Sequence, residues 1–237
     1  MDATSFVVKP ETSPERLDFY RRLDRVDTAP LWEVLNRLVT PTPQSGIVPA
    51  AWRYDDLRPL LMDAGRLLTV QEAERRVLVL ENPSLRGQSR ITNSLFAGIQ
   101  LIMPGEIAEA HQHVSSAIRL VLDGEGAYTA VEGEKAKMSR GDFILTPNWA
   151  PHDHGNPSAG PMIWLDVLDV PIVNLFDTSF AEHHPQETQP VSRSEGDALA
   201  RYGANMLPVD YAPRAQAAPS PVFNYPYARR RAALERL

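Results

Sequence analysis

Hydrophobic residues recur at helical spacing over the first seventy residues of the chain. Ser13-Pro14-Glu15 is typical of a helix start, because it supplies a capping hydroxyl, a proline in the first turn and an acidic side chain near the positive end of the helix dipole. The same spacing returns over residues 31–38 and 55–62, and Thr69-Val-Gln-Glu72 has the spacing of a capping box. We therefore predict an N-terminal helical arm over residues 1–74.

The pattern changes at Arg75 to short runs rich in Val, Ile, Leu and aromatic residues. These runs continue to about residue 170 and are separated by turn sequences such as Asn-Pro, Pro-Gly and Asp-Gly. Many short strands at even spacing favour a mainly β barrel or jelly roll over residues 75–170. Residues 123–126 and 132–134 are predicted to be hairpin turns within it.

Prolines become frequent beyond Pro171, and residues 171–237 are predicted to form an extended connector. The prolines that support this prediction are Pro185, Pro190, Pro208, Pro213, Pro219, Pro221 and Pro226. The final stretch, residues 228–237, has the composition of a helix.

Charge and composition exclude several classes of function. The 237 residues include 24 basic and 30 acidic ones, for a net charge of −6, and no Lys/Arg-rich block precedes residue 200, so we expect no nucleic-acid partner. The N-terminus lacks a basic leader with a long apolar run, and no apolar segment reaches the ~18 residues of a membrane span. We therefore expect a soluble cytoplasmic protein without a membrane partner.

Three histidines are the candidate metal ligands. The chain has six histidines and no cysteine, so a metal must be held by nitrogen and oxygen atoms. His111 and His113 stand two residues apart in a predicted strand, so they share one face of it, and His152 can complete the set from another strand. The alternative is that these are ordinary surface or core histidines.

The residues around these histidines resemble the two motifs of the cupin family. In the first, Gly105 precedes His111 and His113 at the family spacing, and in the second Gly141 is followed by Pro147, His152 and Asn156. The resemblance implies a cupin, a double-stranded β-helix or jelly-roll barrel, here with an N-terminal helical arm and a C-terminal Pro-rich connector.

Two positions depart from the cupin pattern. Trp149 stands where the second motif usually has glycine, and Ala117 or Ile118 stands where the first usually has a glutamate ligand. The expected site therefore holds its metal through three imidazoles alone. Such a site leaves open coordination positions, which suits non-haem Fe(II), and its positive charge favours an anionic, chelating substrate.

Further segments resemble gentisate 1,2-dioxygenase and its relatives, salicylate 1,2-dioxygenase and 1-hydroxy-2-naphthoate dioxygenase. The segments that carry this likeness are residues 31–34, 73–76, 87–95, 97–101, 124–131 and 153–156. The resemblance implies Fe(II)-dependent cleavage of an aromatic hydroxy acid with O2, between the ring carbons bearing the carboxylate and the adjacent hydroxyl. Gentisate would give maleylpyruvate. The alternatives are another substrate of the family or a cupin that binds a small molecule without catalysis.

Two charged residues in apolar strands are candidates for the substrate shell. Arg119 would be costly to bury alone, so we expect it either to clamp the substrate carboxylate or to form an internal salt bridge. Asp166 also needs a partner. In the family a matching aspartate is linked to the hydroxyl that gentisate has and salicylate lacks, which favours gentisate; the alternative is an ion pair with Arg119 or Arg75.

The remaining candidates lie close to the predicted metal strands. His154 shares the face of His152 and is expected to act as a base or hydrogen-bond partner for the ring hydroxyl, or else to be satisfied by backbone. By resemblance, Arg75 or Arg76 is a second anion-binding arginine, with a slight preference for Arg75. The resemblance also implies that Gln100 binds substrate and that Gly98 leaves room for the ring. Phe96 and Trp149 are expected either to pack in the core or to stack on the ring.

Members of the family carry two cupin barrels, and the second follows a connector and a Tyr-Pro-x-x-Arg helix. Tyr225-Pro226-Tyr-Ala-Arg229 matches that helix near the end of this chain. The resemblance therefore implies a chain that holds the arm, the metal-binding barrel and a connector leading towards a second cupin that is absent. It also implies a homo-oligomer, often a tetramer.

Overall fold

The computed structural model describes residues 12–203 and 222–237 and divides the chain into two compact units, Met1–Gly46 and Ile47–Leu237. The prolines predicted to extend the connector at positions 208, 213, 219 and 221 lie outside the described residues.

The first unit is a pair of helices, α1 (Pro14–Asp24) and α2 (Leu31–Leu38), as the spacing predicted. The hydroxyl of Ser13 accepts from the backbone N–H of Arg16, which confirms the predicted cap. The helices are tied by Tyr20, whose hydroxyl accepts from Nε1 of Trp32 at 3.1 Å. Most apolar side chains of α2 remain exposed, so this unit has little core of its own.

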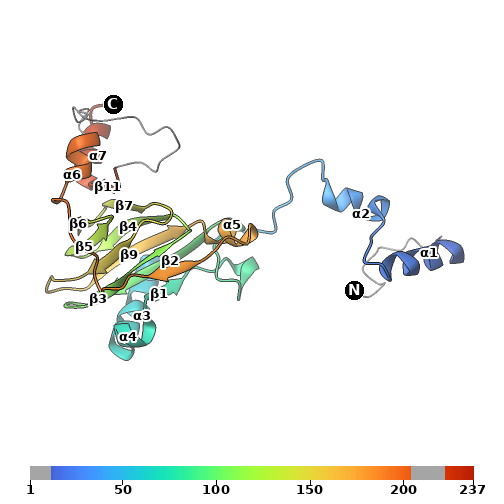
Figure 1. The fold of residues 1–237 in the computed structure, drawn as a ribbon, viewed down its shortest axis with the longest axis horizontal. Helices are drawn as coiled ribbons and strands as arrows, with labels where there is room; N and C mark the ends of the chain where they lie inside the picture. Colours follow the sequence, from blue (N-terminus) through green and yellow to red (C-terminus); the bar gives the residue numbers. More distant parts are fainter. Residues whose placement is uncertain (1–11, 204–221) are drawn as a thin grey trace. The chain divides into compact units, whose positions relative to one another are not determined.

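The second unit begins with α3 (Tyr54–Leu67) and α4 (Val70–Ala73). The predicted third helix extends further than expected, to Leu67. It contains Pro59, which lacks an N–H and so interrupts the hydrogen-bond ladder once without ending the helix. The capping box is confirmed: Thr69 and Glu72 bond each other's backbone N–H. Helix α3 lies on the outside of the barrel (Figure 1). Its Leu61 is buried in an apolar cluster with Ile99, Leu101 and Ile163.

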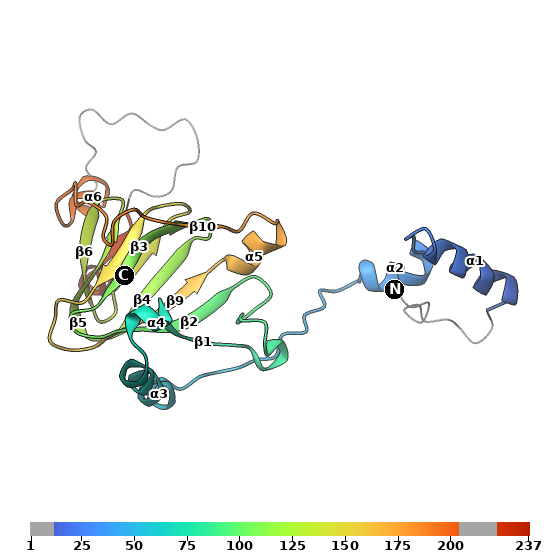
Figure 2. The same cartoon turned by 60° about the horizontal axis from the view of Figure 1, so that its bottom comes forward.

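Two antiparallel sheets face each other and form the barrel. The six-stranded sheet has the order β1 (Arg76–Val79), β2 (Phe96–Ile102), β9 (Met162–Leu168), β4 (Ala117–Asp123), β7 (Phe143–Thr146) and β11 (Asn224–Tyr225). The five-stranded sheet has the order β10 (Ala181–His183), β3 (Ile107–His113), β8 (His152–Gly155), β5 (Glu125–Val131) and β6 (Glu134–Ser139). Two packed sheets of this kind are a jelly roll, which confirms the predicted fold class (Figure 2).

One of the two predicted hairpin turns is wrong. Glu132-Gly133 joins β5 to β6, which pair antiparallel, so this turn is confirmed. Residues 123–126 instead join β4 to β5, and these strands belong to opposite sheets. The Asp-Gly sequence there lies where the chain crosses from one sheet to the other. Gly124 fits this crossing because its φ is +91° and a side chain would collide with the backbone of Pro161 and Met162.

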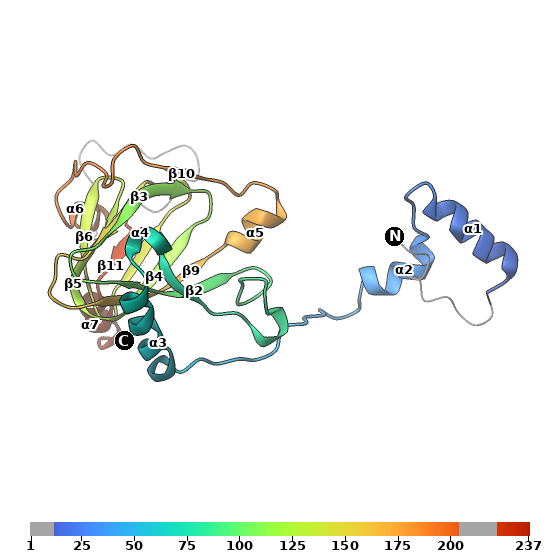
Figure 3. The same cartoon turned by 90° about the horizontal axis from the view of Figure 1, so that it is seen from below.

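The shorter helices lie at the ends and edges of the barrel. They are the 3₁₀ turn Pro83–Leu85, α5 (Val170–Leu175), α6 (Asp197–Tyr202) and α7 (Tyr227–Leu234). Helix α5 lies at one end of the barrel, and α6 and α7 lie at the other (Figures 1 and 3). The predicted C-terminal helix is present as α7, which begins one residue earlier and ends three residues earlier than expected.

The connector contributes to the barrel, because β10 and β11 add a strand to each sheet. Gln189 lies between β10 and β11 in the sequence, and its side chain is buried. Its backbone N–H donates to Asp153, and its side chain donates to the carbonyls of Ala130 and Pro151. The buried carboxylate of Glu134 accepts from the backbone N–H of Ala198. These bonds hold the described part of the connector against the five-stranded sheet.

Candidate metal centre and substrate pocket

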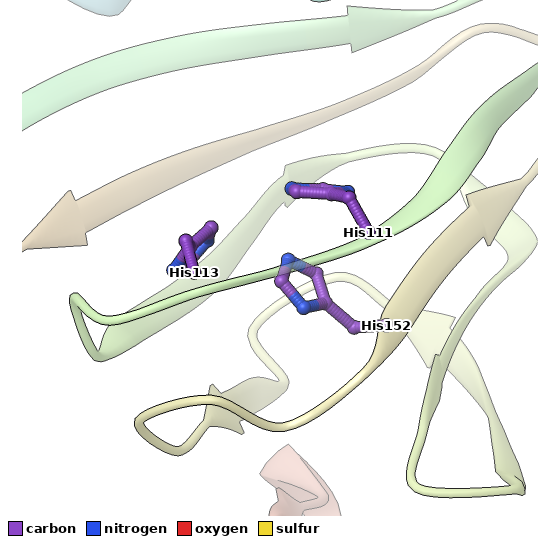
Figure 4. A group of neighbouring side chains, drawn as sticks. All are labelled: His111, His113 and His152. Carbon is purple, nitrogen blue, oxygen red and sulfur yellow. The ribbon is translucent and has the colours of Figure 1, made fainter. Parts of the chain in front are cut away.

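The three predicted ligands meet inside the barrel. His111 and His113 lie on β3, His152 lies on β8, and His111 stands opposite His152 in the antiparallel pair. One ligand nitrogen from each ring can be chosen so that all lie within 4.8 Å of one another. Figure 4 shows the three rings turned towards a common point. No carboxylate of the described residues joins this cluster, in line with Ala117 at the usual glutamate position.

A β-bulge in β3 brings the two histidines of that strand to the inner face. Ala108 stands opposite His154, whereas His111 stands opposite His152, so β3 uses one residue more than β8 over this interval. Ala108 packs in the barrel core, so its side chain lies on the inner face of β3. Without the extra residue, simple alternation would place Ala110 and Gln112 on that inner face and the two histidines on the outer one. The bulge changes the face and turns His111 and His113 inward.

Backbone carbonyls orient the three ligand rings. Nδ1 of His111 lies 3.1 Å from the carbonyl oxygen of Glu109, Nδ1 of His113 lies 2.6 Å from that of Ser115, and Nδ1 of His152 lies 2.9 Å from that of Ala150. A carbonyl can only accept, so Nδ1 of His113 and Nδ1 of His152 carry the hydrogen and their Nε2 atoms keep the lone pair. Nδ1 of His111 also lies 2.7 Å from Nη2 of Arg75, which can only donate, so the carbonyl contact alone does not fix the tautomer of that ring. Nε2 of His152 is buried without a hydrogen-bond partner. A metal ion would satisfy that nitrogen, so the residues present fit a metal.

Burial keeps the site histidines neutral. Desolvation lowers the pKa of His111 to about 3, and the neighbouring Arg75 guanidinium adds to the effect. Burial also lowers the pKa of His113 and holds the pKa of His152 well below the usual value. Neutral imidazole is the form that binds metal, so the rings need not lose a proton at neutral pH.

The two adjacent arginines have different surroundings. Arg76 is buried and forms a bidentate salt bridge with Glu106, and its Nε donates to the carbonyl of Leu68. Arg75 reaches the metal strand instead, where its Nη2 lies 2.7 Å from both the Glu109 carbonyl oxygen and Nδ1 of His111. A cavity of about 450 Å³ is lined by both Arg75 and His111.

The structure pairs the two buried charges of the predicted substrate shell with each other. Nε of Arg119 lies 3.0 Å from Oδ1 of Asp166, and both side chains are almost fully buried. These atoms are not aligned as a hydrogen bond, so the contact is an ion pair. Arg119 also donates to the hydroxyl of Thr146, and Oδ2 of Asp166 accepts from Nε1 of Trp164 at 2.7 Å. The salt bridge that the sequence left as an alternative is therefore present.

Burial disfavours the charged form of both Arg119 and Asp166, so it shifts their pKa values in opposite directions. Desolvation lowers the pKa of Arg119 and raises the pKa of Asp166, while each charge favours the other. Arg75 is likewise desolvated, and the charge of Arg119 adds to the lowering of its pKa. Two guanidinium groups against one buried carboxylate leave this part of the barrel with an excess of positive charge.

His154 is fully buried and close to the metal cluster. Its ring centroid lies 5.9 Å from that of His152 and 5.2 Å from that of Trp164. Nδ1 lies 2.8 Å from the hydroxyl oxygen of Thr129 on the neighbouring strand, so a side chain rather than backbone orients this ring. Burial holds the pKa of His154 far below its ordinary range, which keeps the ring neutral.

Gln100 and Gly98 share the inner face of β2. Gln100 is buried opposite Trp164, and Gly98 stands opposite Asp166. A side chain added at Gly98 would collide with Val77 and approach the ring of Phe96 at 3.3 Å. The space beside Gly98 is thus partly taken by Val77, and the glycine leaves the β-branched side chain of β1 room to lie over the barrel interior.

Phe96 and Trp149 occupy different places. Phe96 lines a cavity of about 680 Å³ together with Leu168 and residues of α5. Trp149 packs on Phe180 with ring centroids 4.6 Å apart, and its backbone N–H donates to the carbonyl of His113. Its φ of +59° lies in the left-handed region, which explains why glycine is usual at this position of the motif.

Sequence reasoning missed the hydroxyl partners of the buried site. Thr129 and Thr146 bond His154 and Arg119, yet each stands in an apolar strand where threonine is an ordinary choice. The available signal was parity: Thr146 is two residues from the buried Ile144, so both point into the barrel.

Comparisons with known proteins agree with this geometry. Residues 98–168 match the family described as Cupin domain. The chain is 56% identical to gentisate 1,2 dioxygenase 1 of Aquipseudomonas alcaligenes over 231 residues, which is 98% of this chain and 66% of that protein. It is 34% identical to 5-aminosalicylate 1,2-dioxygenase of a Comamonas species, covering 95% of this chain and 60% of that protein. The chain thus spans less than two thirds of the length of these relatives.

A solved structure shows the same arrangement of elements. The salicylate 1,2-dioxygenase from Pseudoaminobacter salicylatoxidans, solved as adducts with gentisate, superimposes with a TM-score of 0.86 at 33% identity, over 97% of this chain and 63% of that one. Among the residues that the structure describes, none of the helices is long and apolar enough to cross a membrane.

Proposed function

The chain belongs to the family of cupin ring-cleaving dioxygenases that includes gentisate 1,2-dioxygenase, and from this premise we propose that its metal centre cleaves the ring of gentisate. The reaction consumes one O2 per gentisate and retains both oxygen atoms in the product, maleylpyruvate. The observation that carries the proposal is the buried, unpartnered Nε2 of His152 beside His111 and His113, in a chain 56% identical to a gentisate dioxygenase.

We propose Fe(II) as the metal, held by Nε2 of the three histidines. Fe(II) with three protein ligands supplies open coordination positions for substrate oxygen atoms and dioxygen. The protein's contribution is orientation and charge. The carbonyls at Glu109, Ser115 and Ala150 fix the ligand rings, and burial removes competing water from Nε2.

Arg75 and Arg119 would hold the substrate carboxylate. A planar guanidinium can give two parallel hydrogen bonds to a carboxylate, and both side chains are desolvated, which strengthens that attraction. The carboxylates of Asp166, Glu109 and Glu74 favour the charge of Arg75, but its contacts at the metal strand are to a carbonyl and an imidazole. Arg119, in contrast, already lies 3.0 Å from Asp166. We therefore assign the larger part of carboxylate binding to Arg75.

Asp166 and His154 would act on the hydroxyl groups of the ring. Asp166 balances one guanidinium charge and can accept a hydrogen bond from the hydroxyl that gentisate carries and salicylate lacks. His154, neutral and beside the metal cluster, would accept the proton of the hydroxyl next to the carboxylate. Gln100 and Phe96 would complete the wall of the pocket, and Gly98 would leave space at its centre.

Oxygen uptake tests the proposal directly. Protein loaded with Fe(II) is given gentisate, salicylate, 5-aminosalicylate and 1-hydroxy-2-naphthoate in turn, with uptake measured at an electrode and the gentisate product identified by its absorbance and mass. We expect gentisate to be the best substrate by kcat/KM. No uptake with any of them, at one iron per chain, would make the site one for ligand binding without catalysis, and faster turnover of another acid would reassign the substrate.

The remaining expectations extend the same proposal. We propose that residues 1–74 serve as an arm, residues 75–170 as the catalytic barrel and residues 171–237 as a connector. We also propose a cytoplasmic homo-oligomer, a tetramer by family resemblance, which sedimentation of the purified chain would reveal. A monomer at micromolar concentration would contradict the assembly and leave the site assignment unaffected.

A further inference from the structure

His154 differs from two of the metal ligands in what fixes its proton. The rings of His113 and His152 face backbone carbonyls, which accept under all conditions and so favour the Nδ1–H tautomer. Nδ1 of His154 faces the hydroxyl of Thr129 at 2.8 Å, and a hydroxyl can either donate or accept. The position of the proton on His154 therefore depends on where the hydroxyl hydrogen of Thr129 points.

Met138 supplies the second half of the arrangement. The Thr129 hydroxyl oxygen lies 3.2 Å from the sulfur of Met138, across the pair of strands β5 and β6. A thioether sulfur has no hydrogen and can only accept. When the hydroxyl donates to the sulfur, its oxygen accepts from Nδ1–H of His154, and both hydrogens are used. Thr129, Met138 and His154 are all fully buried, so no bulk water can replace either bond.

We propose that Met138 and Thr129 form a buried relay that holds His154 in the Nδ1–H tautomer, so that Nε2 is a hydrogen-bond acceptor towards the pocket. Thr129 is then a positioning residue that acts through His154, and Met138 sets the direction of the Thr129 hydroxyl. Acceptance of a substrate hydroxyl proton by His154 rests on the proposed function, whereas the tautomer does not.

Nitrogen NMR of the imidazoles tests the relay without turnover. The full chain is labelled with ¹⁵N-histidine and measured metal-free and with Zn(II), and His154→Gln assigns the resonances. We expect a protonated, pyrrole-type Nδ1 and an unprotonated, pyridine-type Nε2. In Met138→Leu, which keeps the volume but removes the sulfur acceptor, we expect the two shifts to move towards each other as the second tautomer is populated. Thr129→Ser keeps the hydroxyl and is expected to keep the wild-type shifts.

The kinetic arm uses the same variants loaded with Fe(II). Thr129→Val removes the hydroxyl at nearly constant volume, and we expect kcat for gentisate to fall about tenfold while Thr129→Ser restores it. Iron content and thermal unfolding of each variant separate this effect from a loss of folding. Where Thr129→Val does not fold, Met138→Leu decides by its shifts alone.

A protonated Nε2 in the wild-type protein would overturn the relay, and so would shifts unchanged in Met138→Leu. If the wild-type protein takes up no oxygen, the proposed function fails while the NMR shifts still decide the tautomer.

Discussion

The barrel interior has two halves that are built from the same strands. In one half the inward side chains are polar or charged, and in the other, two residues away along the strand, they are apolar and almost completely buried. The pairs along single strands are Gln100 and Ile102 on β2, Arg119 and Val121 on β4, Thr146 and Ile144 on β7, and Asp166 and Trp164 on β9.

The difference teaches that strand parity determines the face of a side chain but not its chemical surroundings. The apolar half stabilises the fold through close packing, which needs no specific partner. The polar half needs specific partners for its buried charges, as Arg119 has in Asp166 and Thr146 on the neighbouring strands. The site therefore costs stability, and the apolar half offsets that cost within the same layers.

The largest expected effect comes from removing one ligand in the polar half. His152→Ala takes away one of three nitrogens, so we expect iron binding to be lost and oxygen uptake to fall by at least ~10³-fold, since the metal carries the chemistry. Iron per chain by elemental analysis and oxygen uptake are the measurements. Gln112→Ala, on the same strand as two of the ligands, is the matched control and should keep its iron. Retained iron in His152→Ala would contradict the three-histidine site.

The second-largest effect is expected from breaking the buried ion pair of Arg119 and Asp166, which should destabilise the folded protein. Asp166→Asn leaves the Arg119 guanidinium without its charge partner, at a cost of about 3–5 kcal/mol in the free energy of unfolding. Urea denaturation measures it. The double variant Asp166→Asn/Arg119→Met should recover part of this loss, because neither buried charge then remains. No recovery in the double variant would show that the pair is not the source of the effect.

Truncation in the apolar half should separate stability from metal binding. Ile144 is fully buried, so Ile144→Ala should lower the free energy of unfolding by about 2–5 kcal/mol through lost burial and a residual cavity. Iron content measured below the unfolding transition should stay at the wild-type value. A proportional loss of iron would mean that the two halves are not independent.

The smallest expected effect is the response to acid. The pKa of His111 is lowered to about 3 in the folded protein. Between about pH 6.5 and pH 3, His111 is therefore protonated in the unfolded chain and neutral in the folded protein. Stability of the metal-free protein is therefore expected to fall as the pH is lowered through this window, by about 1 kcal/mol from His111 between pH 7 and pH 5.5. His111→Gln should reduce this slope in denaturation series at each pH, and an unchanged slope would count against the shift.

Much of the site could be predicted from the sequence, except for the side chains that the buried site residues contact. The spacing of His111, His113 and His152 predicted their meeting, and apolar surroundings predicted that Arg119 and Asp166 need partners. The choice between substrate and salt bridge needed the register of β4 against β9, where Arg119 stands opposite Asp166. Likewise, only packing distinguished Arg75 at the metal strand from Arg76 at Glu106.

The sequence by itself determined the fold class, the capped helices and the meeting of the three histidines, because periodicity, capping and motif spacing act over a few residues. Tertiary structure decided the bulge that turns His111 and His113 inward, the crossing at residues 123–126 and the partners of each buried charge. Those outcomes depend on strands that are distant in sequence and on which sheet each strand joins. Short-range patterns carry no record of that choice, since strands of both sheets share the same alternation of side chains.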